Sequence, residues 1–338
     1  MSWLGLDIGG AHIKLATADR FALTHQLPLW RDKSKLVIVL RRLLAEAPPA
    51  DHVVVTMTGE LADCFPSRRE GVEHIVQSVV AAAAGRHVRF YRLDGRLVAA
   101  TVATQQYELV ASANWHALGT FAARWIPENG MLIDIGSTTT DVLPISKGNL
   151  LHQGHNDTQR LIHGELVYTG VERSSIAGIV RDVPYRGADC PVMNELFATS
   201  GDVYLLTDDL SENSTNRKTA DQAPATKPAA RTRLSRLIGA TDEEFNHRDA
   251  AIIAEHVRNA QVQLIADAVR RVAERLPGPA SDIIISGQGE FLATLVIKSA
   301  NLDGQRNIIS MAKRSGRGVS RAAPAYALAV LAQEMEQP

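Results

Sequence analysis

The sequence has little of several features that would link it to an oxidising compartment, a membrane or a polyanion. Only Cys64 and Cys190 are cysteines, and they form no C-x-x-C pair or metal-ligand spacing, so both are expected to be reduced thiols of a cytoplasmic protein. The net charge of −1 provides no attraction to nucleic acid or an anionic membrane. No apolar run approaches the ~20 residues of a membrane helix, and no secretory signal is visible.

The remaining composition is that of a globular protein. Hydrophobic residues make up 45% and charged residues 22% of the 338 residues, close to the average. Such a chain forms one or two domains and buries roughly three quarters of its unfolded surface. Short apolar runs such as 52–57 alternate with helical patterns such as 33–47, which predicts an α/β fold with a mixed or parallel sheet.

Two segments, 4–14 and 131–142, share one pattern, in which a buried strand leads through Asp-x-Gly into a tight turn and a second strand. The aligned positions are Asp7 with Asp134, Gly9 with Gly136, and Gly10 with Ser137. A turn of this kind directs backbone N–H groups and hydroxyls to one point, which suits phosphate oxygens. The pair predicts two similar half-molecules that face one anionic ligand.

The two aspartates would repel a phosphate unless a cation lay between them. Asp7 and Asp134 therefore predict a Mg²⁺ ion held largely through water, because Mg²⁺ gives up its hydration shell reluctantly. The alternative is that each aspartate only caps its own turn. His12 stays open between local packing and catalysis. The predicted phosphate ligands in these turns are Gly9, Gly10, Gly136, Ser137, Thr138 and Thr139.

A third strand and glycine turn lies at 282–292, with Gly287 and Gly289 as further predicted phosphate ligands. In order, the three turns resemble the phosphate 1, phosphate 2 and adenosine motifs of the actin/sugar kinase/Hsp70 superfamily. The resemblance implies two RNase H-like α/β domains with a central cleft, the first formed by 1–120 plus 318–338 and the second by 121–317. Gln288 departs from the small residue that many nucleotide-binding members have between the glycines.

Local patterns outside the turns give further expectations. Residues 109–126 are predicted to form one helix whose small residues allow close packing. Residues 191–198 are predicted to be helical and 202–206 to form a strand. The segment 208–231 has almost no large apolar residue, and a loop of that length is usually a lid or a disordered stretch. These two alternatives stay open.

Five segments carry a more specific resemblance. They are GLDIGGAHIK, MTGELADCFPSRREGV, LIDIGSTTTDV, GELVYTGVERS and SGQGEF. Together they resemble hydantoinase/oxoprolinase-related proteins of tetrahydromethanopterin-linked one-carbon metabolism. Archaeal relatives are methanofuran-biosynthesis synthases, which join an aminomethyl-furanmethanol diphosphate to the phenol of a glutamyl-tyramine, form an ether and release pyrophosphate. A bacterial member would be expected to make the related methylofuran, with tyrosine as an alternative to tyramine.

The resemblance implies a transferase with small-molecule substrates and no requirement for ATP. Its implied catalytic residues are Asp7, Lys14, Asp134 and Asp141, and its implied substrate-binding residues are Glu60, Arg68, Arg69, Glu165 and Tyr168. The base for the phenol proton stays open among Asp141, Glu60 and Glu165. Two other functions also stay open, an ATP-dependent kinase or amidohydrolase and a non-catalytic nucleotide-sensing protein. The sequence does not determine the oligomeric state, and a homo-oligomer is one alternative.

Overall fold

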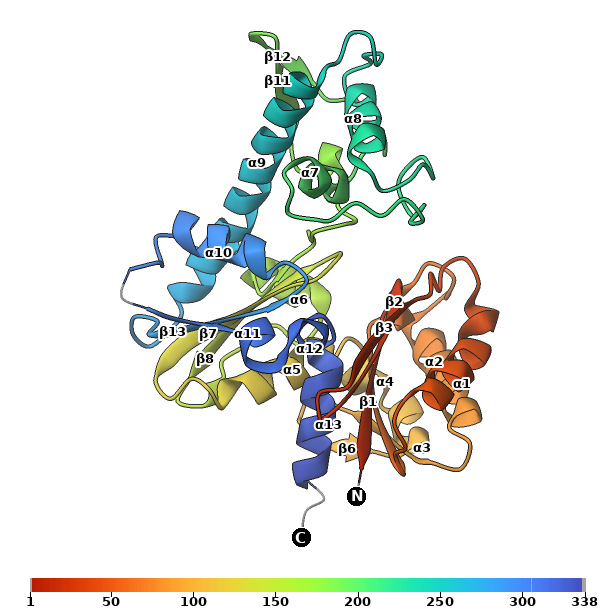
Figure 1. The fold of residues 1–338 in the computed structure, drawn as a ribbon. Coiled ribbons are helices and arrows are strands. Elements are labelled where there is room, and N and C mark those ends of the chain that lie inside the picture. Colours follow the sequence, from red (N-terminus) through yellow and green to blue (C-terminus); the bar gives the residue numbers. More distant parts are fainter. Residues whose placement is uncertain (1, 305, 336–338) are drawn as a thin grey trace.

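The computed structural model describes residues 2–304 and 306–335 and contains two six-stranded sheets that face each other across the molecule (Figure 1). In the first sheet the strand order is β3-β2-β1-β4-β5-β6, with β1 antiparallel to β2 and parallel to β4. Its strands are β1 (Trp3–Ile8), β2 (His12–Thr17), β3 (Ala22–Gln26), β4 (His52–Met57), β5 (His87–Tyr91) and β6 (Leu97–Val98).

The second sheet repeats this arrangement. Its order is β10-β8-β7-β13-β14, with β9 beside β8, and β7 is antiparallel to β8 and parallel to β13. Its strands are β7 (Asn129–Ile135), β8 (Thr140–Ser146), β9 (Asn149–Leu150), β10 (Leu166–Val167), β13 (Asp282–Gly287) and β14 (Asn307–Ser310). The repeated order confirms the predicted pair of RNase H-like units, the fold of the actin/sugar kinase/Hsp70 superfamily.

Helices cover both sheets. Beside the first sheet lie α1 (Leu36–Glu46), α2 (Arg68–Ala82), α3 (Ala100–Gln105) and α4 (Tyr107–Val110). The helices that follow in the chain are α5 (Asn114–Ala123), α6 (Asp157–His163), α9 (His247–Ala273), α10 (Glu290–Ser299), α11 (Met311–Ser315), α12 (Arg317–Arg321) and α13 (Ala323–Met335). Among the described residues no helix combines the length and apolar character needed to span a bilayer.

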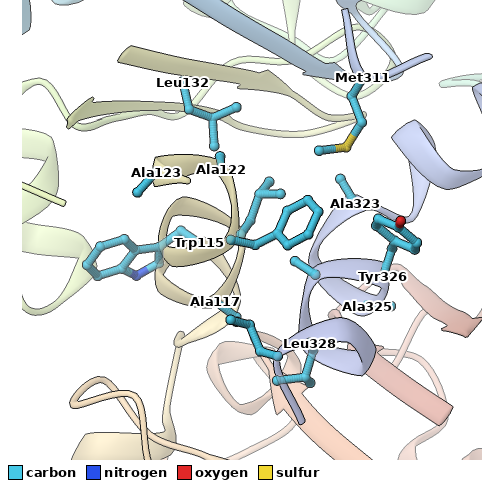
Figure 2. Packing of buried hydrophobic residues seen from close by; sticks show 14 of the residues in the cluster. Trp115, Ala117, Ala122, Ala123, Leu132, Met311, Ala323, Ala325, Tyr326 and Leu328 are labelled. Atoms are coloured by element: carbon cyan, nitrogen blue, oxygen red, sulfur yellow. The ribbon is translucent and has the colours of Figure 1, made fainter. Parts of the chain in front are cut away.

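The core between the sheets is built on α5 and α13 (Figure 2). Alanines line much of both helices, so their backbones approach closely around larger residues such as Trp115 and Tyr326. At Gly5 of β1 even a methyl group would lie 2.0 Å from the carbonyl oxygen of Ala325, so α13 packs directly on the first sheet. This packing agrees with assigning 318–338 to the first unit. Residues 336–338 lie outside the described residues, and the division into domains stays a proposal.

The predicted helix over 109–126 is wrong in its continuity. The chain forms α4, breaks at residues 111–113 and resumes as α5. At the break Ser112 has a φ of 49°, a left-handed conformation that is uncommon for a residue other than glycine. Buried residues continue through the break, but they face different cores: Val110 and Ala111 pack in the core of the first sheet, and Ala113 and Ala117 pack in the core between the sheets.

A third packed region rises above the second sheet along the upper part of α9 (Figure 1). It holds α7 (Ser200–Leu206), α8 (Lys227–Arg236) and the hairpin of β11 (Asp182–Tyr185) and β12 (Ala188–Pro191), around its own apolar core. The predicted strand over 202–206 is wrong, because these residues lie in α7 with a capping box at Thr199. The predicted helix over 191–198 is also absent, and that stretch is irregular apart from the last residue of β12.

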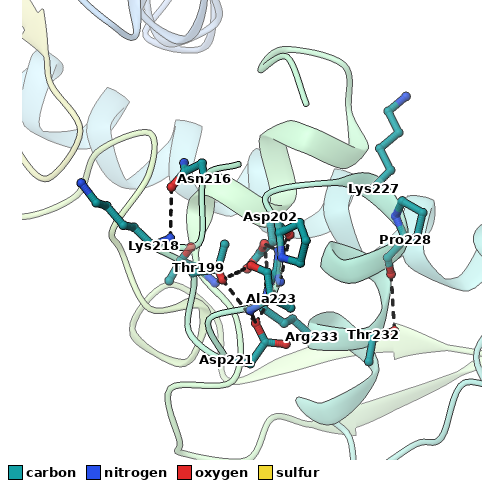
Figure 3. A network of polar contacts seen from close by, with 12 residues as sticks. Thr199, Asp202, Asn216, Lys218, Asp221, Ala223, Lys227, Pro228, Thr232 and Arg233 are labelled. Atoms are coloured by element: carbon teal, nitrogen blue, oxygen red, sulfur yellow. Dashed lines mark hydrogen bonds and ion pairs between the residues drawn. The ribbon is translucent and has the colours of Figure 1, made fainter. Parts of the chain in front are cut away.

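The segment predicted as a loop at 208–231 ends earlier, because α8 begins at Lys227 with a proline in its first turn. A network of polar contacts helps to hold the loop in place (Figure 3). Arg233, only 1% exposed, contacts Asp202 through two nitrogens at 2.8 and 2.6 Å and reaches Asp221 of the loop at 3.0 Å. Composition indicated too little apolar surface to hold this segment, and a buried arginine supplies the attachment instead. Lid-like motion stays a prediction.

Candidate active site

A cavity of about 560 Å³ lies between the two units, where the two glycine turns face each other. The predicted site residues that line it are Asp7, Gly9, Gly10, Lys14, Asp134, Gly136, Ser137, Thr138, Thr139, Asp141 and Tyr168. Most of the predicted catalytic and phosphate-binding residues therefore lie at one place, although they come from opposite halves of the chain.

The two turns have the same hydrogen-bond geometry. The Gly9 amide donates to the carbonyl of His12 at 2.9 Å, and the Gly136 amide donates to the carbonyl of Thr139 at the same distance. Within the described residues, the amides that follow in each turn (Gly10 and Ala11; Ser137 to Thr139) have no hydrogen-bond partner. Unpaired amides beside a cavity are suited to binding an anion such as a phosphate.

A glycine from another segment supports each turn. The Cβ of any other residue at position 59 would lie 3.1 Å from the carbonyl oxygen of Ile8, just before the first turn. At Gly170 a Cβ would lie 2.6 Å from both the Gly136 oxygen and the Thr138 nitrogen. These contacts give the segments 57–72 and 164–174 a physical role, because each packs against the backbone of one phosphate-type turn.

Three buried carboxylates, those of Asp7, Asp134 and Asp141, line the cavity. Strand register places Asp7 opposite Lys14, and Asp134 opposite Asp141. Lys14 lies 3.5 Å from Asp7, and the other carboxylate oxygen of Asp7 is buried without a partner among the described residues. Burial raises the pKa of Asp7, and Lys14 partly offsets this. Burial and the nearby charge of Asp141 raise the pKa of Asp134 to about 7, although the Ser286 hydroxyl donates a hydrogen bond to it.

Arg160 of α6 is a site residue that sequence reasoning missed. Its guanidinium contacts Asp141 at 2.6 Å, lies 4.2 Å from the ring centre of Trp115, and is 2% exposed. One face of the arginine therefore binds a carboxylate while the other rests on an aromatic ring. No local motif marks Arg160, because its partner is 19 residues earlier and on a strand.

Arg173 was also missed, although it lies within the segment 164–174. It stacks 4.6 Å from the ring centre of Trp30, which belongs to the first unit, and lies at 3.5 Å from the Thr138 hydroxyl. The contact joins the two halves of the chain beside the cavity, which both residues line. Burial, with help from nearby Lys14, Arg173 and Lys218, lowers the pKa of His12 to about 4, so His12 lines the cavity as a neutral ring at physiological pH.

Four of the predicted substrate-binding residues do not line the cavity. Glu165 is fully buried and accepts bonds from the amides of Gln153 and Gly154 and from Arg275. It is a structural residue, and the assignment of Glu165 as substrate ligand or base is corrected. Arg69 stacks on Tyr107 at 4.5 Å. Glu60 is 1% exposed beside Ser112, and Arg68 also lies outside the cavity lining.

The third glycine turn also differs from its predicted role. The Gly287 amide donates to the Ser320 hydroxyl, and the Gly289 amide donates to the Ile135 carbonyl. Gly287 has a φ of 89°, and a Cβ there would lie 2.3 Å from the Ile135 oxygen. Both glycines therefore join β13 to the end of β7, and their amides are not available to a phosphate. Gln288 instead donates to Glu172, which adjoins the second turn.

The donor set fits a hydrated Mg²⁺ ion. Asp7 provides a buried carboxylate oxygen without a partner, and the mutual repulsion among Asp7, Asp134 and Asp141 is of the kind that a divalent cation relieves. No group of three His, Cys, Asp or Glu side chains within 2–304 and 306–335 could ligate a metal directly. An ion at Asp7 and Asp134 would accordingly keep most of its water ligands.

Comparison with known proteins supports one family. The family model described as hydantoinase/oxoprolinase matches residues 51–335. The chain belongs to the hydantoinase/oxoprolinase family. The stated resemblance to this family is confirmed.

Within the family, the chain is similar to two curated synthases. The protein from Methanocaldococcus jannaschii is 32% identical over 334 residues, which cover 98% of this chain and 97% of that protein. The protein from Methanococcus vannielii is 29% identical over 62% of this chain and 94% of its own length. Both are named (4-{4-[2-(gamma-L-glutamylamino)ethyl]phenoxymethyl}furan-2-yl)methanamine synthase.

Among solved structures, nucleotide-free acetone carboxylase is similar in fold. Its TM-score is 0.50 at 12% identity, and the match covers 94% of this chain and 51% of that chain. At this identity the likeness concerns the fold alone.

Proposed function

We propose that this protein is an ether-forming transferase of methanofuran-type cofactor biosynthesis. It joins a furan carrying an aminomethyl group and a hydroxymethyl diphosphate to the phenol of a tyramine or tyrosine derivative, and it releases pyrophosphate. The observation that carries the proposal is the 32% identity over 98% of the chain to the M. jannaschii synthase, whose name describes a phenoxymethyl-furan product. The proposal includes glutamyl-tyramine as the acceptor. For a bacterial member of the family it includes methylofuran as the final product.

The two glycine turns are the proposed diphosphate site. The unpaired amides that follow Gly9 and Gly136 would receive the phosphate oxygens, and Lys14 and Arg173 would add positive charge. Bound Mg²⁺ would supply further neutralisation of the leaving pyrophosphate. The turns are rigid because Gly59 and Gly170 pack against them, so the donors need no rearrangement as charge develops.

The reaction exchanges one C–O bond for another. The bond between the methylene carbon on C4 of the furan and the diphosphate oxygen breaks with its electron pair on oxygen, and the furan ring oxygen stabilises the resulting cation. The phenol oxygen then bonds to the same carbon and loses its proton. Trp30, Leu166 and Tyr168 line the cavity with apolar surface that can hold the rings and exclude water, which would otherwise trap the cation as an alcohol.

ATP is not required under this proposal, because the diphosphate is already an activated leaving group. The third turn agrees with this, since the amides of Gly287 and Gly289 are used within the protein. The reaction is proposed to take place in the cytoplasm on small molecules, without nucleic acid. A homo-oligomer stays an alternative to a monomer.

The test combines mass spectrometry of the coupled product with a pyrophosphate assay. Wild-type protein given the furan diphosphate, the phenol and Mg²⁺ should produce ether and pyrophosphate in equal amounts, with or without ATP. In Asp134→Asn ether formation should fall by ~10²-fold or more, and Asp182→Asn, at an exposed position on β11, is the control for loss of one negative charge away from the cavity. A strict need for ATP with accumulation of ADP would instead support a kinase or ATP-dependent amidohydrolase.

A further inference from the structure

Beside the cavity lies a buried carboxylate that the proposed chemistry leaves without a task. Glu60 is 1% exposed, although its neighbours Thr58 and Leu61 line the cavity. One of its carboxylate oxygens accepts a hydrogen bond of 2.9 Å from the Ser112 hydroxyl, and the other has no partner among the described residues. A buried carboxylate oxygen left unpaired is costly, and one way to satisfy it is to protonate it.

The link between Glu60 and the cavity is Ser112. This serine lies in the break between α4 and α5 with a φ of 49°, and a left-handed backbone at a residue other than glycine is strained and is found most often at functional sites. Its hydroxyl donates to Glu60 at 2.9 Å, and a hydrogen bond with Ser112 also contributes to the pKa of Asp157 of α6. A hydroxyl has one proton to donate and lone pairs to accept with, so Ser112 can donate to Glu60 and receive from Asp157 together.

Asp157 is the member of this group that reaches the substrate space. It lines the cavity together with Asp141 and Arg160. Burial raises the pKa of Asp157, and the negative charge of Asp141 raises it further. The positive charges of Arg160 and Arg68 and a hydrogen bond with Ser112 partly offset this rise. Burial likewise raises the pKa of Glu60 to about 7, with Ser112 and Arg68 opposing and Asp157 reinforcing the shift. Both carboxylates are therefore better proton acceptors than free ones.

The other candidates for this task are already engaged. Asp141 commits one oxygen to the guanidinium of Arg160 at 2.6 Å. Glu165 is bound to two amides and Arg275, outside the cavity.

We infer that Asp157 is the general base for the acceptor hydroxyl, and that Ser112 relays the proton to Glu60. This inference rests on the proposed function. The phenol proton moves to the Asp157 carboxylate as the phenol oxygen bonds to the methylene carbon on C4 of the furan. Asp157 then gives a proton to the Ser112 oxygen while the Ser112 hydroxyl proton moves to Glu60. The phenol has lost one proton, Glu60 has gained one, and Asp157 and Ser112 return to their starting states.

The experiment compares two acceptors, an ordinary phenol with a pKa of about 10 and a ring-fluorinated phenol that is already ionised at neutral pH. Removing a general base slows a reaction by roughly 10²–10⁴-fold. Asp157→Asn should therefore lose at least ~10²-fold in ether formation with the ordinary phenol and less than ~10-fold with the ionised one. Pyrophosphate release should continue in this variant, with water capture giving the furan alcohol in place of the ether.

Two further variants test the relay. Ser112→Gly removes the hydroxyl and accepts the left-handed backbone, and Glu60→Gln removes the terminal proton acceptor while keeping its shape. Both should show a smaller loss, about 10-fold, again confined to the ordinary phenol. Asp182→Asn should match wild type, and thermal melting of each variant verifies that it is folded.

The outcomes separate the inference from the proposed function. Equal losses with both phenols, or no loss in Asp157→Asn, would overturn Asp157 as the base. Wild-type rates in both Ser112→Gly and Glu60→Gln, beside a slow Asp157→Asn, would overturn the relay. Absence of ether from wild-type protein with either phenol would mean that the proposed function itself is wrong.

Discussion

Replacement of Asp134 by asparagine should make the protein more stable and less active. The side chain keeps its shape, and its Oδ1 can still accept the hydrogen bond from Ser286. What disappears is a buried negative charge that lies close to Asp141 and Asp7. In the metal-free protein that charge is unfavourable, because burial and the neighbouring carboxylates raise the pKa of Asp134 from 3.8 to about 7.

The pH dependence follows from linkage. The folded state holds the Asp134 proton more tightly than the unfolded state, so stability is highest below the unfolded pKa of 3.8 and falls until the pH passes the folded pKa of about 7. A pKa difference of about three units corresponds to at most ~4 kcal/mol. The charges of Asp7 and Asp134 repel each other, so removing the charge of Asp134 lets Asp7 lose its proton more readily. We therefore expect a gain of about 1–3 kcal/mol at pH 8 and none near pH 4.

The assay is thermal melting of Asp134→Asn and wild type between pH 4 and 8 with a chelator present. At pH 8 the variant should melt about 2–6 °C higher, and the difference should shrink toward pH 4. Added Mg²⁺ should reduce the difference in melting temperature between variant and wild type, because the ion stabilises the Asp134 carboxylate of the wild type. Ether formation should fall by ~10²-fold or more. A variant that is equally destabilised at both ends of this range would refute the reasoning.

Three further predictions concern the ligand site and its support. Pyrophosphate and Mg²⁺ together should raise the melting temperature by more than the sum of their separate effects. At a ligand concentration 100-fold above Kd the folded state would gain up to about 2.7 kcal/mol. Simple additivity in a thermal-shift assay would argue against a shared site. Gly170→Ala should destabilise the protein by about 1–3 kcal/mol and slow pyrophosphate release, because its Cβ would lie 2.6 Å from the second turn. Gly178→Ala, where a Cβ meets nothing within 4 Å, should leave both denaturation midpoint and rate unchanged. Arg233→Met should speed tryptic cleavage within 208–226 relative to Arg236→Met at an exposed position, since Arg233, unlike Arg236, contacts Asp221 of that segment. Equal cleavage rates would mean that Arg233 does not hold the segment.

The sequence predicted the paired turns and their chemistry because their information is local. A buried strand, an Asp-x-Gly turn and a second strand occur within about a dozen residues, so Asp7 and Asp134 could be aligned before their positions were known. The same locality explains why β1, β4 and β7 were identifiable from short apolar runs. The match of the two turns was then enough to predict that they face one ligand.

Where local patterns are ambiguous, tertiary packing decided the structure. Residues 202–206 are apolar enough for a strand, but the capping box at Thr199 and the packing of Tyr204 in the core select α7. Residues 109–126 have a helical pattern throughout, yet the chain breaks at Ser112. The loop before α8 is polar by composition and is nevertheless attached, because its partner Arg233 follows it in the chain and is buried against Asp202.

The same distinction separates the predicted site residues that line the cavity from those that do not. Asp7, Asp134 and the turn glycines are fixed by their own segments, so the sequence by itself determined them. Glu60, Glu165 and Gly287 have suitable chemistry in suitable motifs, but their direction depends on partners far away in the chain, such as Ser112, Arg275 and Ser320. Arg160 and Asp157 belong to no recognised motif and reach the cavity only because α6 lies beside the second sheet. Sequence fixes which groups are available, and long-range packing fixes which of them share a cavity, because burial and direction depend on the whole fold.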